Sequence, residues 1–237
     1  MALTDQSTPI RSGEELDASL IDPYLKAHIP GLTGLPTISQ FPGGASNLTY
    51  LLEYPGQEFV LRRPPFGHKA KSAHDMGREF RILNQLRDGF PYCPKAYVHC
   101  TDESVIGAEF YVMERVKGII LRSELPAELG LARTESLCKS FIDKLVELHK
   151  VDYQACGLGD LGKPEGYVAR QIRGWSDRYE KALTPDAPKW EAVKAWLNDK
   201  MPADHPTSSI VHNDYRFDNV ILDPGNPMQI IGVLDWE

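Results

Sequence analysis

The sequence predicts an α+β fold in which an antiparallel sheet of about five strands precedes a mainly helical half. Two observations lead to this expectation. Short β-branched and aromatic runs separated by turn formers recur between residues 37 and 114, whereas apolar residues at helical spacing dominate residues 133–198. The character of the chain changes at Gly118. We therefore expect an N-terminal lobe at residues 1–117 and a C-terminal helical lobe at residues 118–237.

Composition and charge limit the classes of function. The 237 residues are 42% hydrophobic and 25% charged, which is typical of a globular protein with a substantial core. The formal net charge of -7 does not favour a nucleic-acid partner. Four cysteines show neither paired metal spacing nor a disulfide framework. No segment approaches ~18 apolar residues and no signal peptide is evident, so we expect a cytoplasmic protein without a membrane partner. The oligomeric state stays open.

The elements of the first half are predicted in order along the chain. Residues 1–11 are expected to be a mobile tail. The sequence Ser12-Gly13-Glu14-Glu15 resembles a capping box and predicts a helix that ends before Pro30-Gly31. Turn formers then separate short β runs. We expect strands at residues 37–41, 48–54, 58–62, 96–100 and 110–114, with a helix at residues 75–86 between the third and fourth.

The second half is predicted to contain three helices, near residues 133–150, 168–179 and 190–198. An apolar stripe on the first, including Leu137 and Leu148, is expected to be core and not a cofactor site. Trp175 and Trp196 could line a substrate pocket, but aromatic residues at helical spacing favour core packing.

The segment 210–237, IVHNDYRFDNVILDPGNPMQIIGVLDWE, concentrates polar side chains at two strand ends. Asp214 and Asn219 bracket a short polar loop, and turn formers at residues 223–227 predict a hairpin that returns Asp235 beside that loop. The expected site thus offers three carboxylates and one carboxamide. Such oxygen ligands suit magnesium, which prefers a few protein ligands plus substrate phosphates.

Individual roles follow from the chemistry of these side chains. Asp214 could orient an attacking hydroxyl and accept its proton, and Arg216 could offset phosphate charge. If residues 235–237 stay extended, Asp235 and Glu237 share one face. His212 could be a buried histidine that bonds the loop backbone, or it could act directly in the chemistry.

The pattern His212-x-Asp214, then Asn219, then Asp235-Trp236-Glu237 after a hairpin resembles the aminoglycoside phosphotransferase and choline kinase family. The wording VHNDYRFDNVILDP and VLDWE is most similar to the kinase-like domains of acyl-CoA dehydrogenase family proteins. The resemblance implies a protein-kinase-like, two-lobed fold and an ATP- and magnesium-dependent phosphotransferase acting on a small-molecule hydroxyl. It implies Asp214 as the base, and Asn219 and Asp235 as magnesium ligands.

The resemblance also assigns the nucleotide site. Gly43, Gly44 and Ser46 lie in a loop expected to cover the phosphates, although a plain hairpin turn would have similar residues. Arg62 stands where relatives carry a phosphate-binding lysine, with Glu79 as its ion-pair partner. Arg63 is the alternative for that position.

The purine is expected at the hinge formed by Met113, Glu114 and Val116, where backbone groups leave ATP and GTP equally open. The basic run 62–71 favours a hydroxyacyl-CoA-like acceptor over an aminoglycoside. Family members continue beyond the Asp-x-Glu motif with helices that wall the acceptor site. Two other functions stay open: a non-catalytic nucleotide-binding module, and a magnesium-dependent phosphohydrolase.

Overall fold

The computed structural model describes residues 6–42, 47–66, 75–122, 125 and 129–236. An antiparallel five-stranded sheet in the order β1-β2-β3-β5-β4 forms its centre, as predicted. The strands are β1 (Thr37–Gln40), β2 (Leu48–Tyr54), β3 (Gln57–Arg63), β4 (Ala96–Cys100) and β5 (Phe110–Glu114).

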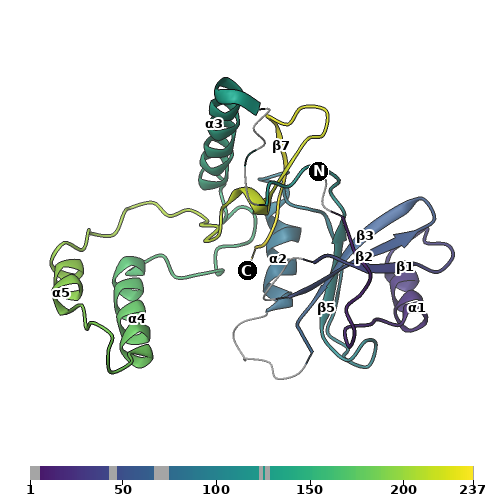
Figure 1. Cartoon of the computed structure of the whole chain (residues 1–237), viewed down its shortest axis with the longest axis horizontal. Helices are drawn as coiled ribbons and strands as arrows, with labels where there is room; N and C mark the ends of the chain where they lie inside the picture. The colour runs from purple at the N-terminus through teal and green to yellow at the C-terminus, as the bar shows by residue number, and fades with distance from the viewer. Residues whose placement is uncertain (1–5, 43–46, 67–74, 123–124, 126–128, 237) are drawn as a thin grey trace.

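Two helices, α1 (Ala18–His28) and α2 (Met76–Leu86), lie on opposite faces of this sheet (Figure 1). Each face therefore has its own apolar cluster, and successive strand residues alternate between the two clusters. In β3, Leu61 belongs to the α1 side and Val60 to the α2 side. This alternation decides which basic residue of β3 can reach a ligand site.

The N-terminal segment differs from the expectation in two ways. Thr8 pairs with Gln40 of β1 through backbone hydrogen bonds of 2.8 and 2.9 Å, so the segment after residue 6 docks on the sheet edge. The predicted capping box is wrong as well. Asp17 caps α1 by accepting a hydrogen bond from the Ser19 backbone N–H, because an aspartate one residue before the helix reaches that group directly.

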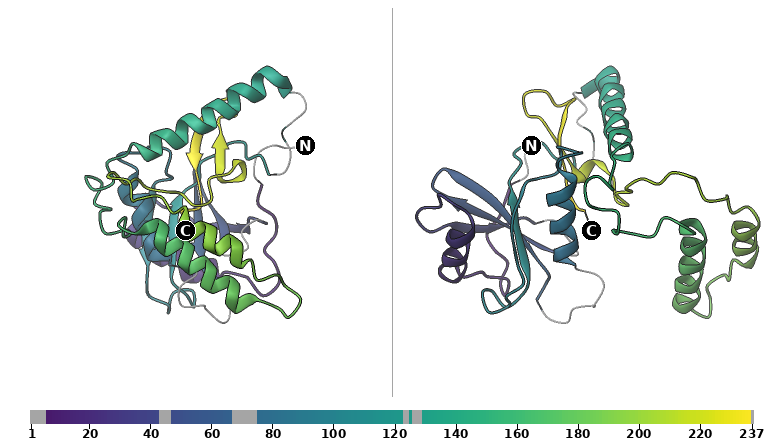
Figure 2. Two further views of the ribbon diagram at one scale, coloured as in Figure 1. Left: turned by 90° about the vertical axis from the view of Figure 1, so that its left-hand side faces the viewer. Right: turned by 180° about the vertical axis from the view of Figure 1, so that it is seen from behind.

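The three helices of the second half are confirmed, but two of them pack differently from the expectation. Helix α3 (Gly130–His149) buries its stripe at Leu137 and Leu148. Figure 2 shows α4 (Tyr167–Ala182) and α5 (Glu191–Asp199) lying together, away from the sheet. Neither helix has a buried residue, and Trp175 and Trp196 are 62% and 60% exposed. These tryptophans are therefore neither core nor lining of the cleft described below.

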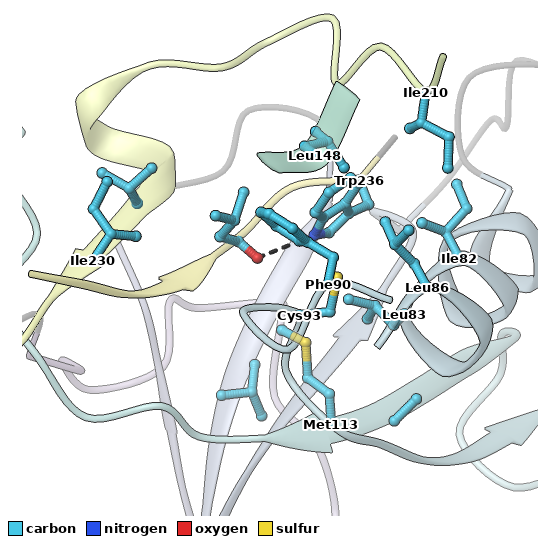
Figure 3. Close-up of a cluster of buried hydrophobic side chains, with 14 of the residues drawn as sticks. Ile82, Leu83, Leu86, Phe90, Cys93, Met113, Leu148, Ile210, Ile230 and Trp236 are labelled. Atoms are coloured by element: carbon cyan, nitrogen blue, oxygen red, sulfur yellow. Dashed lines mark hydrogen bonds between the residues drawn. The ribbon is translucent and has the colours of Figure 1, made fainter. Parts of the chain in front are cut away.

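The hairpin of β6 (Val220–Leu222) and β7 (Ile230–Val233) is confirmed and is preceded by a single 3₁₀ turn, η2 (Phe217–Asn219). Its base is anchored by Trp236, which is 3% exposed and packs against Phe90 in the buried cluster (Figure 3). The indole Nε1 donates to Val233 O at 3.0 Å. This anchoring fixes the backbone on both sides of Asp235.

The connection from β5 to the helical half passes close to the hairpin. Ile119 pairs with Leu222 of β6 through backbone hydrogen bonds of 2.9 and 2.8 Å. A Cβ atom on Gly118 would lie 2.3 Å from Ile221 Cγ2, so the approach requires glycine. The proposed lobe boundary at residues 117–118 stays a prediction. None of the described helices is both long and apolar enough to cross a lipid bilayer.

Candidate active site

A cleft of about 680 Å³ opens between the sheet and the C-terminal hairpin. Its lining combines the α2 side of the sheet, the segment after β5, and both polar ends of the hairpin. The residues that matter here are Asn47, Thr49, Glu58, Val60, Arg62, Glu79, Met113, Glu114, Arg115, Val116, Lys117, Asp214, Arg216, Asp218, Asn219 and Asp235. The structure thus brings together the described residues predicted for the site, except the two alternatives Arg63 and His212.

Arg62 is the centre of the charged network in this cleft. Its Nη1 donates to Glu79 Oε1, which is the ion pair predicted from the sequence. Its Nη2 donates to Asp235 Oδ1 at 3.1 Å, a contact that the sequence did not indicate. The side chains of Arg62 and Glu79 are 9% and 2% exposed, so water screens this pair little.

Tyr111 lies behind this network as the cross-strand partner of Arg62. The ring is fully buried, and burial raises the pKa of the phenol well above its usual range. The charge of Glu79 raises the pKa further, while Arg62 opposes the rise. A neutral Tyr111 therefore forms the floor of the Arg62 position.

Arg63 does not share the orientation of Arg62. Consecutive strand residues point to opposite faces, and Arg63 lies on the α1 side. Its Nη1 donates to Ile106 O at 3.1 Å, and its guanidinium covers the Phe66 ring at 3.8 Å. Arg63 is therefore excluded as the alternative phosphate contact. The remaining basic residues of the 62–71 run lie outside the described residues.

Asp214 and Asn219 bracket the polar loop as predicted, and hydrogen bonds that the sequence did not indicate join them. The Asn219 Nδ2 group donates to both the backbone O and Oδ2 of Asp214, each at 3.0 Å. Both partners are acceptors, so the amide nitrogen must face Asp214 and the amide oxygen faces away from it. That oxygen is the atom available to a cation. Arg216 pairs with Asp218 and is largely exposed at the cleft.

His212 packs behind the polar loop, and its side chain does not line the cleft. Its Nε2 lies 2.9 Å from Leu234 O, the ring is 4% exposed, and it packs on Trp236. Burial lowers the pKa of His212, although the Leu234 carbonyl and nearby carboxylates oppose the change. A neutral ring that donates through Nε2–H fits these contacts. Of the two alternatives, the structure supports the buried structural histidine.

Asp235 corrects the expectation of an extended segment after β7. Its φ angle is 69°, in the left-handed region that non-glycine residues rarely occupy. The alternation that would place Asp235 and Glu237 on one face does not apply to such a backbone. Glu237 itself lies outside the described residues. The turn aims Asp235 at Arg62, and strain of this kind is frequent at functional sites.

The predicted nucleotide site has a phosphate-covering loop at one end and a purine-binding hinge at the other. Gly43, Gly44 and Ser46, predicted to cover the phosphates, lie outside the described residues. At the hinge, Met113 is 7% exposed and lines the cleft with Val116.

Glu114 also lines the cleft, but its carboxylate is used elsewhere. It accepts a hydrogen bond from the Lys95 backbone N–H at 3.0 Å and lies 3.3 Å from Arg87. Only the backbone of Glu114 is therefore a candidate for contact with a purine.

Glu58 is a cleft residue that sequence reasoning missed. Its carboxylate bonds Arg115 Nη1 at 2.9 Å and Lys117 Nζ at 2.6 Å. Burial alone would raise the pKa of Glu58, but the two cations outweigh it and the pKa is lowered. The available signal was strand alternation, since Glu58, Val60 and Arg62 are every second residue of β3 and line the same cleft.

The donor set can be tested against magnesium. Among the described residues, no three His, Cys, Asp or Glu side chains form a closed metal cluster. Asp235 and Asn219 nevertheless supply a carboxylate and an amide oxygen at one cleft. Magnesium in nucleotide enzymes typically needs only one or two such ligands, with phosphates and water completing the shell. The residues therefore fit a magnesium–nucleotide complex and not a metal held by protein alone.

A two-part α+β fold with a polar cleft of this kind defines the class of kinase-like phosphotransferases. The model of the Phosphotransferase enzyme family matches residues 37–237, and the chain belongs to this family. A crystal structure from Ralstonia eutropha, assigned to the aminoglycoside phosphotransferases, superposes with a TM-score of 0.79 at 36% identity. That match covers 94% of this chain and 65% of the Ralstonia chain. Macrolide 2'-phosphotransferase type I shares the fold, with a TM-score of 0.64 at 21% identity.

Curated relatives confirm the predicted resemblance to acyl-CoA dehydrogenase family proteins. Acyl-CoA dehydrogenase family member 11 of Gallus gallus is 34% identical over 242 residues, covering 100% of this chain and 31% of the relative. The Homo sapiens protein of the same name is 34% identical, with 94% and 29% covered. The chain thus spans about a third of the length of these relatives.

Proposed function

We propose that this protein transfers the terminal phosphoryl group of ATP, in a magnesium-dependent reaction, to a hydroxyl group of a small molecule. The observation that carries the proposal is the convergence of Asp214, Asn219, Asp235 and Arg62 on one cleft. A candidate base, a candidate metal ligand pair and a buried phosphate-binding cation are the parts that such catalysis requires.

The proposed roles follow from the contacts. Asp214, held by the Asn219 amide, orients the acceptor hydroxyl and accepts its proton. Asn219 Oδ1 and Asp235 would hold the magnesium ion, which supplies charge stabilisation at the phosphates when it is bound. Arg62, positioned by Glu79, contacts the phosphates, and exposed Arg216 offsets charge as the phosphoryl group moves. The hinge at Met113 to Val116 receives the purine.

The acceptor that we propose is the hydroxyl of a hydroxyacyl-CoA-like ester. The support comes from the curated relatives, whose names refer to acyl-CoA dehydrogenases and in which this chain matches about a third of the length. We extend to this chain the ligand class that these names contain, an acyl-CoA ester. Of the basic run 62–71, Arg62 lines the cleft and Arg63 turns away from it, while the other basic residues lie outside the described residues.

The test is acceptor-dependent ADP formation with magnesium-ATP, using a hydroxyacyl-CoA, the free hydroxy acid and an aminoglycoside. We expect stimulation by the hydroxyacyl-CoA, and a loss of about 10²- to 10⁴-fold in kcat for Asp214→Asn. Stimulation by the aminoglycoside alone would contradict the proposed acceptor. ATP binding without turnover on any acceptor would instead favour a non-catalytic nucleotide-binding module, and phosphate release without an acceptor would favour a hydrolase.

A further inference from the structure

Arg62 makes two carboxylate contacts at once, and the second is to the side chain proposed to bind metal. Nη1 bonds Glu79 of α2, while Nη2 bonds Asp235 Oδ1 at 3.1 Å. Glu79 belongs to the sheet side of the cleft, whereas Asp235 follows β7 on the opposite side. A single guanidinium therefore joins the two walls of the cleft.

The two contacts differ in how easily a ligand can replace them. The Glu79 side chain is 2% exposed, so separating its buried carboxylate from the guanidinium would carry a high cost in free energy. The Asp235 side chain is 33% exposed and faces the cleft. The Arg62–Asp235 contact can therefore be broken from the cleft, while the Arg62–Glu79 contact stays intact.

A divalent cation and the guanidinium would compete for the same carboxylate. Magnesium requires ligand oxygens at roughly 2.0–2.1 Å in near-octahedral geometry. A guanidinium nitrogen already bonded to Asp235 Oδ1 takes up one lone-pair direction and repels a second positive charge. Although Asp235 Oδ2 stays open to a metal ion, the nearby guanidinium charge weakens metal binding at this carboxylate until Arg62 moves away.

We propose that Arg62 is a built-in counter-ion of the metal site, holding Asp235 until nucleotide phosphates draw the guanidinium away. This inference rests on the proposed function and adds an order of events to it: the nucleotide phosphates displace Arg62 from Asp235, and the metal ion then binds tightly. Metal and nucleotide bind with positive coupling, because each removes an obstacle to the other. The planar fork of arginine suits the role, since it bonds two carboxylates in fixed directions where lysine presents a point charge.

The test measures Mn²⁺ binding to the nucleotide-free protein from the electron paramagnetic resonance signal of free Mn²⁺. The main variant is Arg62→Gln with Glu79→Gln, which removes both members of the buried pair and leaves the net charge unchanged. The matched control is Lys117→Gln with Glu58→Gln, another ion pair lining the same cleft, with an Nζ to Oε1 distance of 2.6 Å.

We expect the Arg62/Glu79 double variant to bind Mn²⁺ about tenfold more tightly than the unaltered protein, and the control to change the affinity less than about twofold. Arg62→Lys keeps a cation for Glu79 and serves if the double variant does not fold. This single variant should bind Mn²⁺ more tightly than the unaltered protein, with a smaller gain. Unchanged or weaker Mn²⁺ binding by the folded variants would overturn the inference.

The two proposals fail in distinguishable ways. If Mn²⁺-ATP binds the unaltered protein but the Arg62 variants show no gain without nucleotide, only the counter-ion role is wrong. If the unaltered protein binds no Mn²⁺-ATP at all, the proposed function is wrong, and the counter-ion role is overturned with it.

Discussion

The side-chain amide of Asn219 donates hydrogen bonds to both the backbone O and Oδ2 of Asp214, each at 3.0 Å. One residue therefore fixes the candidate base and, through its other amide atom, presents a candidate metal ligand. Phosphoryl transfer and metal binding should accordingly depend on the same side chain.

Replacement of Asn219 should reduce both properties together. We expect Asn219→Ala to weaken Mn²⁺-ATP binding and to lower kcat, each by about 10- to 100-fold, because ligand and orienting contacts are lost at once. Isothermal titration and steady-state kinetics measure the two effects. Asn226→Ala, which alters a turn asparagine of the hairpin, is the control. A lower kcat with unchanged metal affinity would show that Asn219 orients Asp214 but does not bind metal.

Gly118 should tolerate no side chain. A Cβ atom there would lie 2.3 Å from Ile221 Cγ2 and 2.5 Å from Leu222 O, and the latter is backbone that cannot move cheaply. Gly118→Ala should therefore lower the free energy of unfolding by about 2–4 kcal/mol in urea denaturation. Gly162→Ala is the matched control, since its Cβ would meet no atom within 4 Å. Equal stability of the two variants would argue against the close approach of residue 118 to β6.

Glu79 should be required for stability as well as for positioning Arg62. Glu79→Gln removes the buried carboxylate of the Arg62 ion pair, while the contact from Arg62 to the partly exposed Asp235 remains. We expect a loss of about 2–3 kcal/mol, less than for a pair with no second partner. Chemical denaturation measures the loss, and Glu147→Gln on the exposed side of α3 is the control. A loss no larger than that of the control would indicate that the pair is not buried in solution.

His212 should make the stability depend on pH below neutrality. Burial lowers the pKa of His212 in the folded protein below the ordinary value of 6.5. Between the folded and unfolded pKa values, the ring is therefore protonated in the unfolded chain but neutral in the folded protein. The stabilising contribution is complete above pH 6.5 and falls as the pH drops from there toward the folded pKa. His212→Gln should flatten this part of the stability profile, measured by urea denaturation at a series of pH values. A profile unaffected by His212→Gln would mean that the ring titrates normally.

Most of the fold could be predicted because local signals agreed with the final structure. β-branched runs and turn formers marked the five strands, and the polar loop with its hairpin located Asp214, Asn219 and Asp235. Helical spacing also located α4 and α5 correctly. Their exposure could not be predicted. An apolar stripe identifies the hydrophobic face of a helix, but it does not show whether another element packs on that face.

The detailed geometry of the site depends on contacts between distant residues, which local patterns do not contain. The Arg62 to Asp235 contact joins side chains 173 positions apart. The left-handed backbone at Asp235 could not be predicted either, because the residue at this position is not a glycine. Only the position of each residue in β3 showed that Arg62 and Arg63 point to opposite faces of the sheet. The Glu58 pair with Arg115 and Lys117 likewise needed the fold before it could be recognised.

The most direct test of the account is thermal unfolding with and without magnesium-ATP, for the unaltered protein and for Asp235→Asn. A ligand that binds only the folded state raises the midpoint, and the rise should require both magnesium and the Asp235 carboxylate. We predict a magnesium-dependent rise that Asp235→Asn abolishes. No rise in the unaltered protein, or an equal rise in Asp235→Asn, would contradict a magnesium–nucleotide site at this cleft.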